Sequence, residues 1–177
     1  MKPEDFFLKY APDAIASMKS KGIPASVTLA QAATESGWGV AAFGNNFFGI
    51  KTSKDWKGKN QLWTTTEVLH SATEAEYLSK TGKKFPGVIS ITKQPSGLYL
   101  WKVKDWFRLY DTPRESFEDH ANFFLVNSRY HQAIVDHADG LLFAHDIFIA
   151  GYATAPNYEQ TLAWLIKHYN LTQYDNL

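Results

Sequence analysis

The stretch from Pro24 to Glu35 constrains the fold more than any other part of the chain. Proline is tolerated in the first turn of a helix, and the residues after it (ASVTLAQAATE) read as one helix. Gly37 marks its end, because glycine is favoured just past a helix C-terminus. The many alanines of this helix keep its side chains short. We therefore expect it to pack closely against a neighbouring element.

The other expected elements follow a helix, strand, helix order along the chain. Apolar residues spaced near 3.6 predict a helix over residues 4–20 and later helices over about 112–125, 130–137, 139–150 and 157–169. Asp111 or Thr112 is expected to cap the first of these later helices. Residues 61–68 and 99–110 are expected to form strands, and 69–97 read as irregular and polar. This order indicates an α+β fold, mostly α, with a small β lobe inserted between helical parts.

Composition excludes several classes of function. Lys plus Arg and Asp plus Glu both total 18, so charge gives no case for nucleic acid or an anionic membrane as the main partner. The chain has no cysteine, which removes disulfides and thiol nucleophiles. No run approaches the roughly 18 apolar residues of a membrane span. Residues 1–5 do not resemble a signal peptide, so the sequence shows no export route.

The histidines do not predict a metal site. His131 and His137 are too far apart in sequence to share a helix face as zinc-binding pairs do, and His120 and His145 complete no ligand pattern. A nucleophile elbow and a phosphate-binding loop are also missing from the sequence. We therefore expect neither a metal nor a cofactor.

Glu35 is the residue that most resembles a catalytic group. It lies in the last turn of the expected helix, where the helix carries partial negative charge that disfavours a carboxylate. Burial against Trp38 and nearby phenylalanines would raise its pKa further. A carboxylic acid that keeps its proton near neutral pH is the acid that a glycosidase needs. By position alone, however, a solvated glutamate at a frayed helix end is the better explanation of Glu35.

The residues around Glu35 resemble the signature of the family 73 glycoside hydrolases, the peptidoglycan N-acetylglucosaminidases that include the flagellar hydrolase domain. Further motifs follow in the family's order. The matching stretches are Ala30–Gly39 (AQAATESGWG), Asn46–Lys51 (NFFGIK), Trp56–Gly58 (WKG), Thr64–Glu67 (TTTE), Phe107–Tyr110 (FRLY) with Ser116 and His120, and Gly151–Tyr158 (GYATAPNY).

The resemblance implies a lysozyme-like fold forming a single catalytic domain over residues 1–177, with a β lobe at about 52–110. It implies an endo-β-N-acetylglucosaminidase that cleaves the β-1,4 bond after N-acetylglucosamine in peptidoglycan. Glu35 takes the position of the general acid, and Glu67 that of a second carboxylate. Tyr152 matches a tyrosine near the acid, which could donate a hydrogen bond to the substrate's N-acetyl group or to water.

The role of the second carboxylate stays open. It could activate water, with the two carboxyls roughly 6.5–9.5 Å apart, or act as a nucleophile at about 5–5.5 Å. A third route uses the substrate's own N-acetyl oxygen and leaves Glu67 a supporting role. Glu76 is the alternative residue for the same position.

Four further residues are candidates for substrate binding: Trp38, Asn46, Phe48 and Tyr158. For the three aromatic residues, packing in the core is an equally good explanation. The segment from Val68 to Asp105 is longer than a simple hairpin needs, and it contains Trp101 and several lysines. We interpret it as an enlarged β lobe that extends or clamps a sugar-binding groove.

The expected partner is therefore the glycan strand of peptidoglycan, with no nucleic acid, no membrane insertion and a monomeric enzyme. The expected place of action is the cell wall, in the periplasm or outside the cell, for a phage lysin, a secreted effector or an autolysin. A muramidase or lytic transglycosylase would use an acid in the same place. A wall-binding protein without activity is a third possibility.

Overall fold

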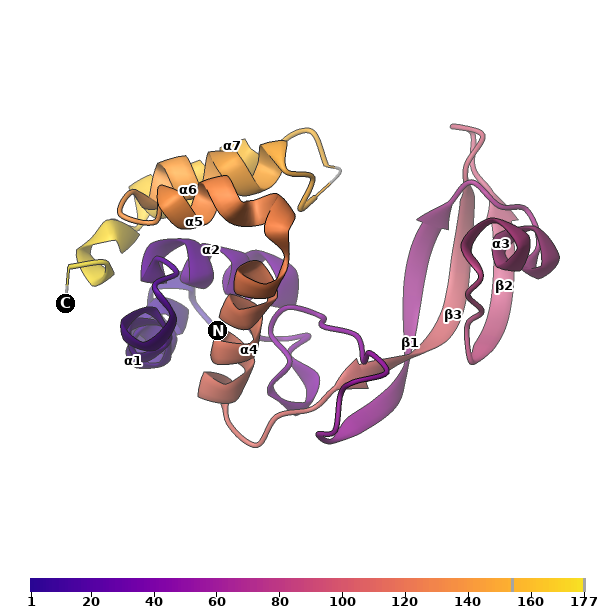
Figure 1. Cartoon of the computed structure of the whole chain (residues 1–177), viewed down its shortest axis with the longest axis horizontal. Helices are drawn as coiled ribbons and strands as arrows, with labels where there is room; N and C mark the ends of the chain where they lie inside the picture. Colours follow the sequence, from indigo (N-terminus) through magenta and orange to yellow (C-terminus); the bar gives the residue numbers. More distant parts are fainter. Residues whose placement is uncertain (154, 177) are drawn as a thin grey trace. The chain divides into compact units, whose positions relative to one another are not determined.

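The computed structural model describes residues 1–153 and 155–176, and the chain forms two compact units in it. The first unit contains residues 1–50 and 110–177, and the second contains residues 51–109 (Figure 1). The first unit is helical, and the second holds a three-stranded sheet. The predicted fold class, mostly helical with a small β part, is confirmed.

Helix α2 (Ala25–Ser36) is the most deeply buried element of the helical unit. Every one of its residues is buried except Thr34 and Glu35. It contacts α1 (Pro3–Lys21), α6 (Gly140–Ile149), α7 (Tyr158–His168) and the short helix η3 (Leu171–Tyr174). The alanine-rich sequence allows this close approach from several sides, which confirms the predicted packing.

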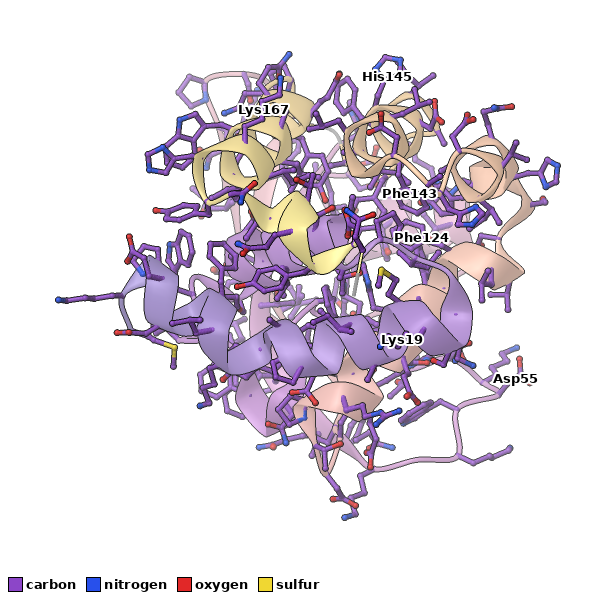
Figure 2. The ribbon with its side chains drawn as sticks, turned by 90° about the vertical axis from the view of Figure 1, so that its left-hand side faces the viewer. Lys19, Asp55, Phe124, Phe143, His145 and Lys167 are labelled. Atoms are coloured by element: carbon purple, nitrogen blue, oxygen red, sulfur yellow. The ribbon has the colours of Figure 1, made fainter. Side chains whose placement is uncertain are left out.

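The remaining helices complete the core around α2. They are η1 (Phe43–Asn45), α4 (Pro113–Val126), η2 (Ser128–Tyr130) and α5 (His131–Val135). Of the two predicted caps, Thr112 holds the start of α4, because its hydroxyl accepts the N–H of Glu115. Phe124 of α4 and Phe143 of α6 point into this core, whereas His145 and Lys167 point to solvent (Figure 2).

The second unit is an antiparallel sheet in the order β1-β3-β2, formed by β1 (Asn60–Leu69), β2 (Gly87–Lys93) and β3 (Tyr99–Arg108). Helix α3 (Glu74–Thr81) lies between β1 and β2 in the chain. The fully buried Trp101 of β3 contacts the rings of Tyr77 and Phe85, and its indole N–H donates to the carbonyl of Ser71 at 2.8 Å. Trp101 is thus central to the core of this unit, to which the fully buried Val103 also belongs.

The prediction that residues 69–97 are irregular is wrong, because α3 and β2 both fall in that segment. Helix α3 has only eight residues, too few for a clear apolar period. Capping by Thr73 and the contact of Tyr77 with Trp101 stabilise it instead. Strand β2 (GVISITK) contains four β-branched residues, a local strand signal that was overlooked among the glycines and prolines around it, and it pairs with β3. Among the described helices, none has the length and apolar character to cross a bilayer.

The contact between α2 and α6 yields a test of this packing. A Cβ atom added at Gly140 would clash with the buried hydroxyl of Ser26. We expect Gly140→Ala to lower the free energy of unfolding by about 1–3 kcal/mol through overpacking, although alanine is the better helix former. Urea unfolding measures this change. In the double variant, Ser26→Ala should restore part of the lost stability. Equal stability of Gly140→Ala and wild type would contradict the close approach of α2 and α6.

Candidate functional site

Glu35 lies in the last turn of α2, immediately before a turn that ends the helix abruptly. Gly37, Trp38 and Gly39 all have positive φ angles, of 54°, 59° and 82°. The hydroxyl of Ser36 accepts the N–H of Gly39 at 2.8 Å and closes this turn. Glu35 itself remains accessible to solvent. Surrounding protein nevertheless removes part of the water around its carboxyl, which raises the pKa of Glu35 above its usual 4.5.

Two tyrosines lie near this carboxyl. Burial, and to a smaller extent the charge of Glu35, raise the pKa of both Tyr152 and Tyr158, so both phenols stay protonated. The rings of these two tyrosines are 5.7 Å apart. The Tyr158 hydroxyl accepts a hydrogen bond of 2.8 Å from the amide of Gln31, one turn before Glu35 on α2. The structure therefore groups Glu35, Tyr152 and Tyr158, which the sequence could only name separately.

Phe48 joins this group through His120 of α4. The Phe48 ring stacks on the His120 imidazole with centroids 3.7 Å apart and planes at 9°. The Nε2 atom of His120 lies 3.4 Å from the Tyr152 hydroxyl. Burial lowers the pKa of His120 from 6.5 to about 3, so the ring is neutral at physiological pH. From the sequence, His120 was considered only as part of a family motif and as a possible metal ligand, so its contact with Tyr152 was missed.

Trp38 and Asn46 are placed differently. The half-buried Trp38 packs edge-on against Phe6, Phe7 and Tyr169. It also lines a surface hollow of about 290 Å³ with Trp164. Asn46 is buried, and its side chain bonds the backbone of Ile50 in both directions at 2.9 Å. Asn46 thus holds the loop that carries Phe48.

Glu67 lies on β1 of the second unit. It forms an ion pair of 2.8 Å with Lys51, which also contacts Asp105 at 3.0 Å. Burial favours the neutral amine, but the hydrogen bonds and charges of Glu67 and Asp105 outweigh it and raise the pKa of Lys51. This pairing was not predicted, because Lys51 and Glu67 lie 16 residues apart in the chain and meet only in the folded unit.

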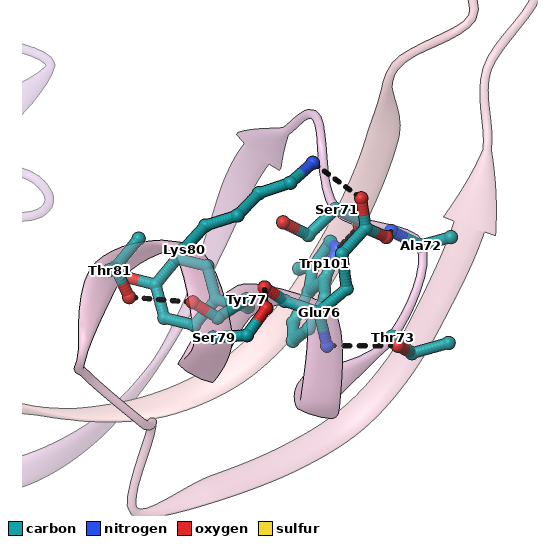
Figure 3. A network of polar contacts seen from close by, with 9 residues as sticks. All are labelled: Ser71, Ala72, Thr73, Glu76, Tyr77, Ser79, Lys80, Thr81 and Trp101. Carbon is teal, nitrogen blue, oxygen red and sulfur yellow. Dashed lines mark hydrogen bonds and ion pairs between the residues drawn. The ribbon is translucent and has the colours of Figure 1, made fainter.

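Glu76 has a structural task in helix α3 (Figure 3). Its backbone N–H donates to the Thr73 hydroxyl at 3.2 Å, and its carboxylate accepts the N–H of Ala72 at 2.8 Å. Lys80, one turn later, bonds the same carboxylate and lowers its pKa. This is the reciprocal arrangement of a helix N-terminal cap. The carboxylate of Glu76 is therefore engaged, whereas the prediction for Glu76 assumed that it was available.

The described residues contain no group of three or more His, Cys, Asp or Glu side chains that could hold a metal ion. The chemistry open to the first unit is thus that of a carboxylic acid with a raised pKa beside two protonated phenols. Such a group can donate a proton to a leaving oxygen. The second unit, taken by itself, contains a carboxylate that is paired with a lysine.

Relatives of known activity resemble this chain over most of its length. The peptidoglycan hydrolase FlgJ of Vibrio parahaemolyticus is 30% identical over 162 residues, which are 88% of this chain and 44% of that protein. The exo-glucosaminidase LytG of Bacillus subtilis is 28% identical over 86% of this chain and 46% of its own length. The chain thus spans less than half the length of these relatives.

A solved structure has the same fold. The glycoside hydrolase domain of FlgJ from Salmonella typhimurium superposes with a TM-score of 0.69 at 28% identity, covering 98% of this chain and 91% of that one. The profile of the glucosaminidase family, described as mannosyl-glycoprotein endo-beta-N-acetylglucosaminidase, matches residues 11–171. The family predicted from the ordered motifs is confirmed, and the chain belongs to the glucosaminidase family of glycoside hydrolases.

Proposed function

We propose that this chain is an endo-β-N-acetylglucosaminidase that hydrolyses the β-1,4 bond after N-acetylglucosamine in peptidoglycan. One observation carries the proposal: in a chain of the glucosaminidase family, Glu35 lies in the last turn of a buried helix and has a raised pKa. The relatives named as peptidoglycan hydrolase, glucosaminidase and autolysin support the substrate. The family description supports internal cleavage, although LytG is named an exo-glucosaminidase.

In this proposal Glu35 is the general acid. Its carboxyl gives its proton to the glycosidic oxygen as the bond to the sugar breaks, and the raised pKa keeps that proton available at higher pH. The accessibility of the residue lets a substrate reach it. Tyr152 is the positioning phenol beside it and keeps its own proton for a hydrogen bond, because its pKa is raised well above 10.0.

Four residues complete the proposed substrate-binding set: Trp38, Asn46, Phe48 and Tyr158. Their positions support different contributions. Tyr158 lies close enough to the acid for the charge of Glu35 to affect its ionisation. Phe48 and Asn46 act through the loop that they stabilise, since both are buried. Trp38 supports the turn after Glu35 through its ring contacts.

Glu67 is the proposed second carboxylate, as the general base or as a stabilising charge. Its ion pair with Lys51 at 2.8 Å holds its carboxylate in one place, which suits both roles. The engaged carboxylate of Glu76 makes that residue the weaker candidate. The proposed site of action is the cell wall, in the periplasm or outside the cell, as the names of FlgJ and of an Enterococcus faecalis autolysin suggest. We propose a monomer that requires no cofactor.

The first prediction concerns the acid. Glu35→Gln keeps the size of the side chain but cannot donate an acidic proton, so we expect turnover of purified sacculi to fall by a factor on the order of 10² to 10⁴. Release of soluble fragments measures turnover, and circular dichroism confirms folding. Wild-type turnover by this variant would remove Glu35 from the mechanism.

Mass spectrometry of the wild-type fragments identifies the bond. Reducing ends on N-acetylglucosamine support the proposal, with fragments of several disaccharides if cleavage is internal. Reducing N-acetylmuramic acid would identify a muramidase, and anhydro ends a lytic transglycosylase. Binding to sacculi without any released sugar would identify a wall-binding protein.

The second prediction follows from the raised pKa of Glu35. The folded chain binds this proton more tightly than the unfolded chain, so the free energy of unfolding falls as pH rises from about 4.5 through the raised value. Gln cannot ionise, so its variant does not lose free energy of unfolding as the pH rises through this range. We expect the melting temperature of Glu35→Gln to be higher than that of wild type at neutral pH. Below pH 4 the two melting temperatures should be equal. Thr34→Ala, a change at the exposed neighbour of Glu35 that involves no ionisable group, is the control and should differ from wild type by the same amount at every pH.

The third prediction separates the two candidate second carboxylates. We expect Glu67→Gln to lower kcat on soluble glycan strands by roughly 10², whereas Glu76→Gln should keep kcat and reduce stability, because it weakens the start of α3. Wild-type kcat in Glu67→Gln would exclude both roles proposed for Glu67 and favour attack by the substrate's own N-acetyl oxygen.

A further inference from the structure

His120 is a buried polar residue whose place in the core needs an explanation. Its side chain lies on α4, and the residue is only 1% exposed. Its Nε2 atom lies 3.4 Å from the Tyr152 hydroxyl, whereas its Nδ1 atom has no hydrogen-bond partner among the described residues. An unpaired buried nitrogen lowers the stability of a fold. A phenylalanine would fill the same space without that loss.

Unlike a hydrocarbon ring, the imidazole of His120 can form a hydrogen bond with the Tyr152 hydroxyl. A neutral imidazole has one donor and one acceptor nitrogen, so Nε2 can pair with the hydroxyl as either. The ring is fixed on two sides, by stacking on Phe48 at 3.7 Å and by the edge contact with Phe124 at 4.9 Å. His120 is therefore a fixed hydrogen-bonding group aimed at one atom.

Tyr152 needs such a partner more than most tyrosines do. It follows Gly151, which has a φ of 78°, in the turn after α6. Its ring is held by contacts with Phe124 and Tyr158 at 5.4 and 5.7 Å. These ring contacts do not determine how the hydroxyl rotates about its C–O bond. Without the His120 contact, the ring would keep its place while the hydroxyl lost its direction.

We propose that His120 is a positioning residue that fixes the direction of the Tyr152 hydroxyl beside Glu35. This inference rests on the proposed glucosaminidase function, because it assigns a task to the phenol in that reaction. His120 touches neither the sugar nor the reacting atoms in this scheme. It acts only through Tyr152, and Phe48 acts by holding the plane of the His120 ring.

A double-variant cycle tests this inference on soluble, uncrosslinked glycan strands of peptidoglycan. His120→Phe keeps a ring for Phe48 to stack on and removes the hydrogen bond. We expect it to lower kcat on the order of tenfold, the size of one hydrogen bond, with KM unchanged. In a Tyr152→Phe background the same change should have no further effect on kcat. Equal losses in both backgrounds would overturn the proposal.

A control separates positioning from general loss of structure. Ser17 of α1 is buried, and its hydroxyl donates to the Phe117 carbonyl of α4 at 3.2 Å, so Ser17→Ala removes a buried bond to the helix that carries His120. We expect Ser17→Ala to lower the melting temperature and keep kcat. A loss of kcat in Ser17→Ala as large as that in His120→Phe would show that His120 has only a structural role.

A spectroscopic readout does not depend on activity. Nitrogen-15 spectra of labelled histidine report which ring nitrogen carries the proton, and the His120→Phe variant identifies the His120 signals. We expect Tyr152→Phe to shift these signals, and unchanged signals would overturn the contact. A wild-type protein that cleaves no glycan would refute the proposed function, while the spectra would still decide whether His120 pairs with Tyr152.

Discussion

The burial of α2 is the constraint on which the helical unit depends. A helix that is covered on nearly all sides must have short side chains, and the alanines of α2 meet this condition. Only Thr34 and Glu35, in its last turn, remain exposed. The same packing that stabilises the unit therefore fixes the backbone of Glu35, while the turn at Gly37 to Gly39 ends the helix before the carboxyl is covered. Removing part of the water around this carboxyl raises its pKa and lowers the stability of the ionised form. In the proposed mechanism, the same raised pKa that lowers the stability lets Glu35 keep a proton that it can donate to the substrate.

Two aromatic groups have different tasks in the helical unit. The rings of Phe6, Phe7 and Trp38 pack against one another and stabilise the core on one side of α2. A second group, formed by Phe48, His120, Tyr152 and Tyr158, combines ring stacking with hydrogen bonds. Buried polar groups that lack a partner are rare, so rings that carry polar atoms indicate a function when they gather beside a carboxyl with a raised pKa. The second group is therefore the better candidate for contact with a substrate.

The second unit reaches stability by other means. Its sheet has three strands and one short helix, and a single buried tryptophan, Trp101, supplies much of its core with Tyr77 and Phe85. Capping by Thr73 and Glu76 fixes the start of α3. The interpretation of residues 68–105 as a groove-extending segment stays a prediction, because the roles that the structure gives to Trp101 and Glu76 are structural. Lys51 and Asp105 hold Glu67 in a cluster that has one cation and two anions.

The sequence alone determined the fold class, the family and the position of Glu35. These follow from local signals: an alanine-rich helix with a glycine stop, alternating strands and ordered motifs. The helix α3 was missed because it is short and is stabilised by its cap and by contact with Trp101, which no local period records. Strand β2 was missed although its β-branched residues are a local signal, because glycines and prolines surround it. Only the tertiary structure decided that Asn46 closes a loop, that Glu76 caps a helix, and that His120 meets Tyr152. Each of these pairings depends on where the chain folds back on itself. The hydrogen-bonding capacity of a side chain is present in the sequence, whereas its partner is fixed only when the core has packed.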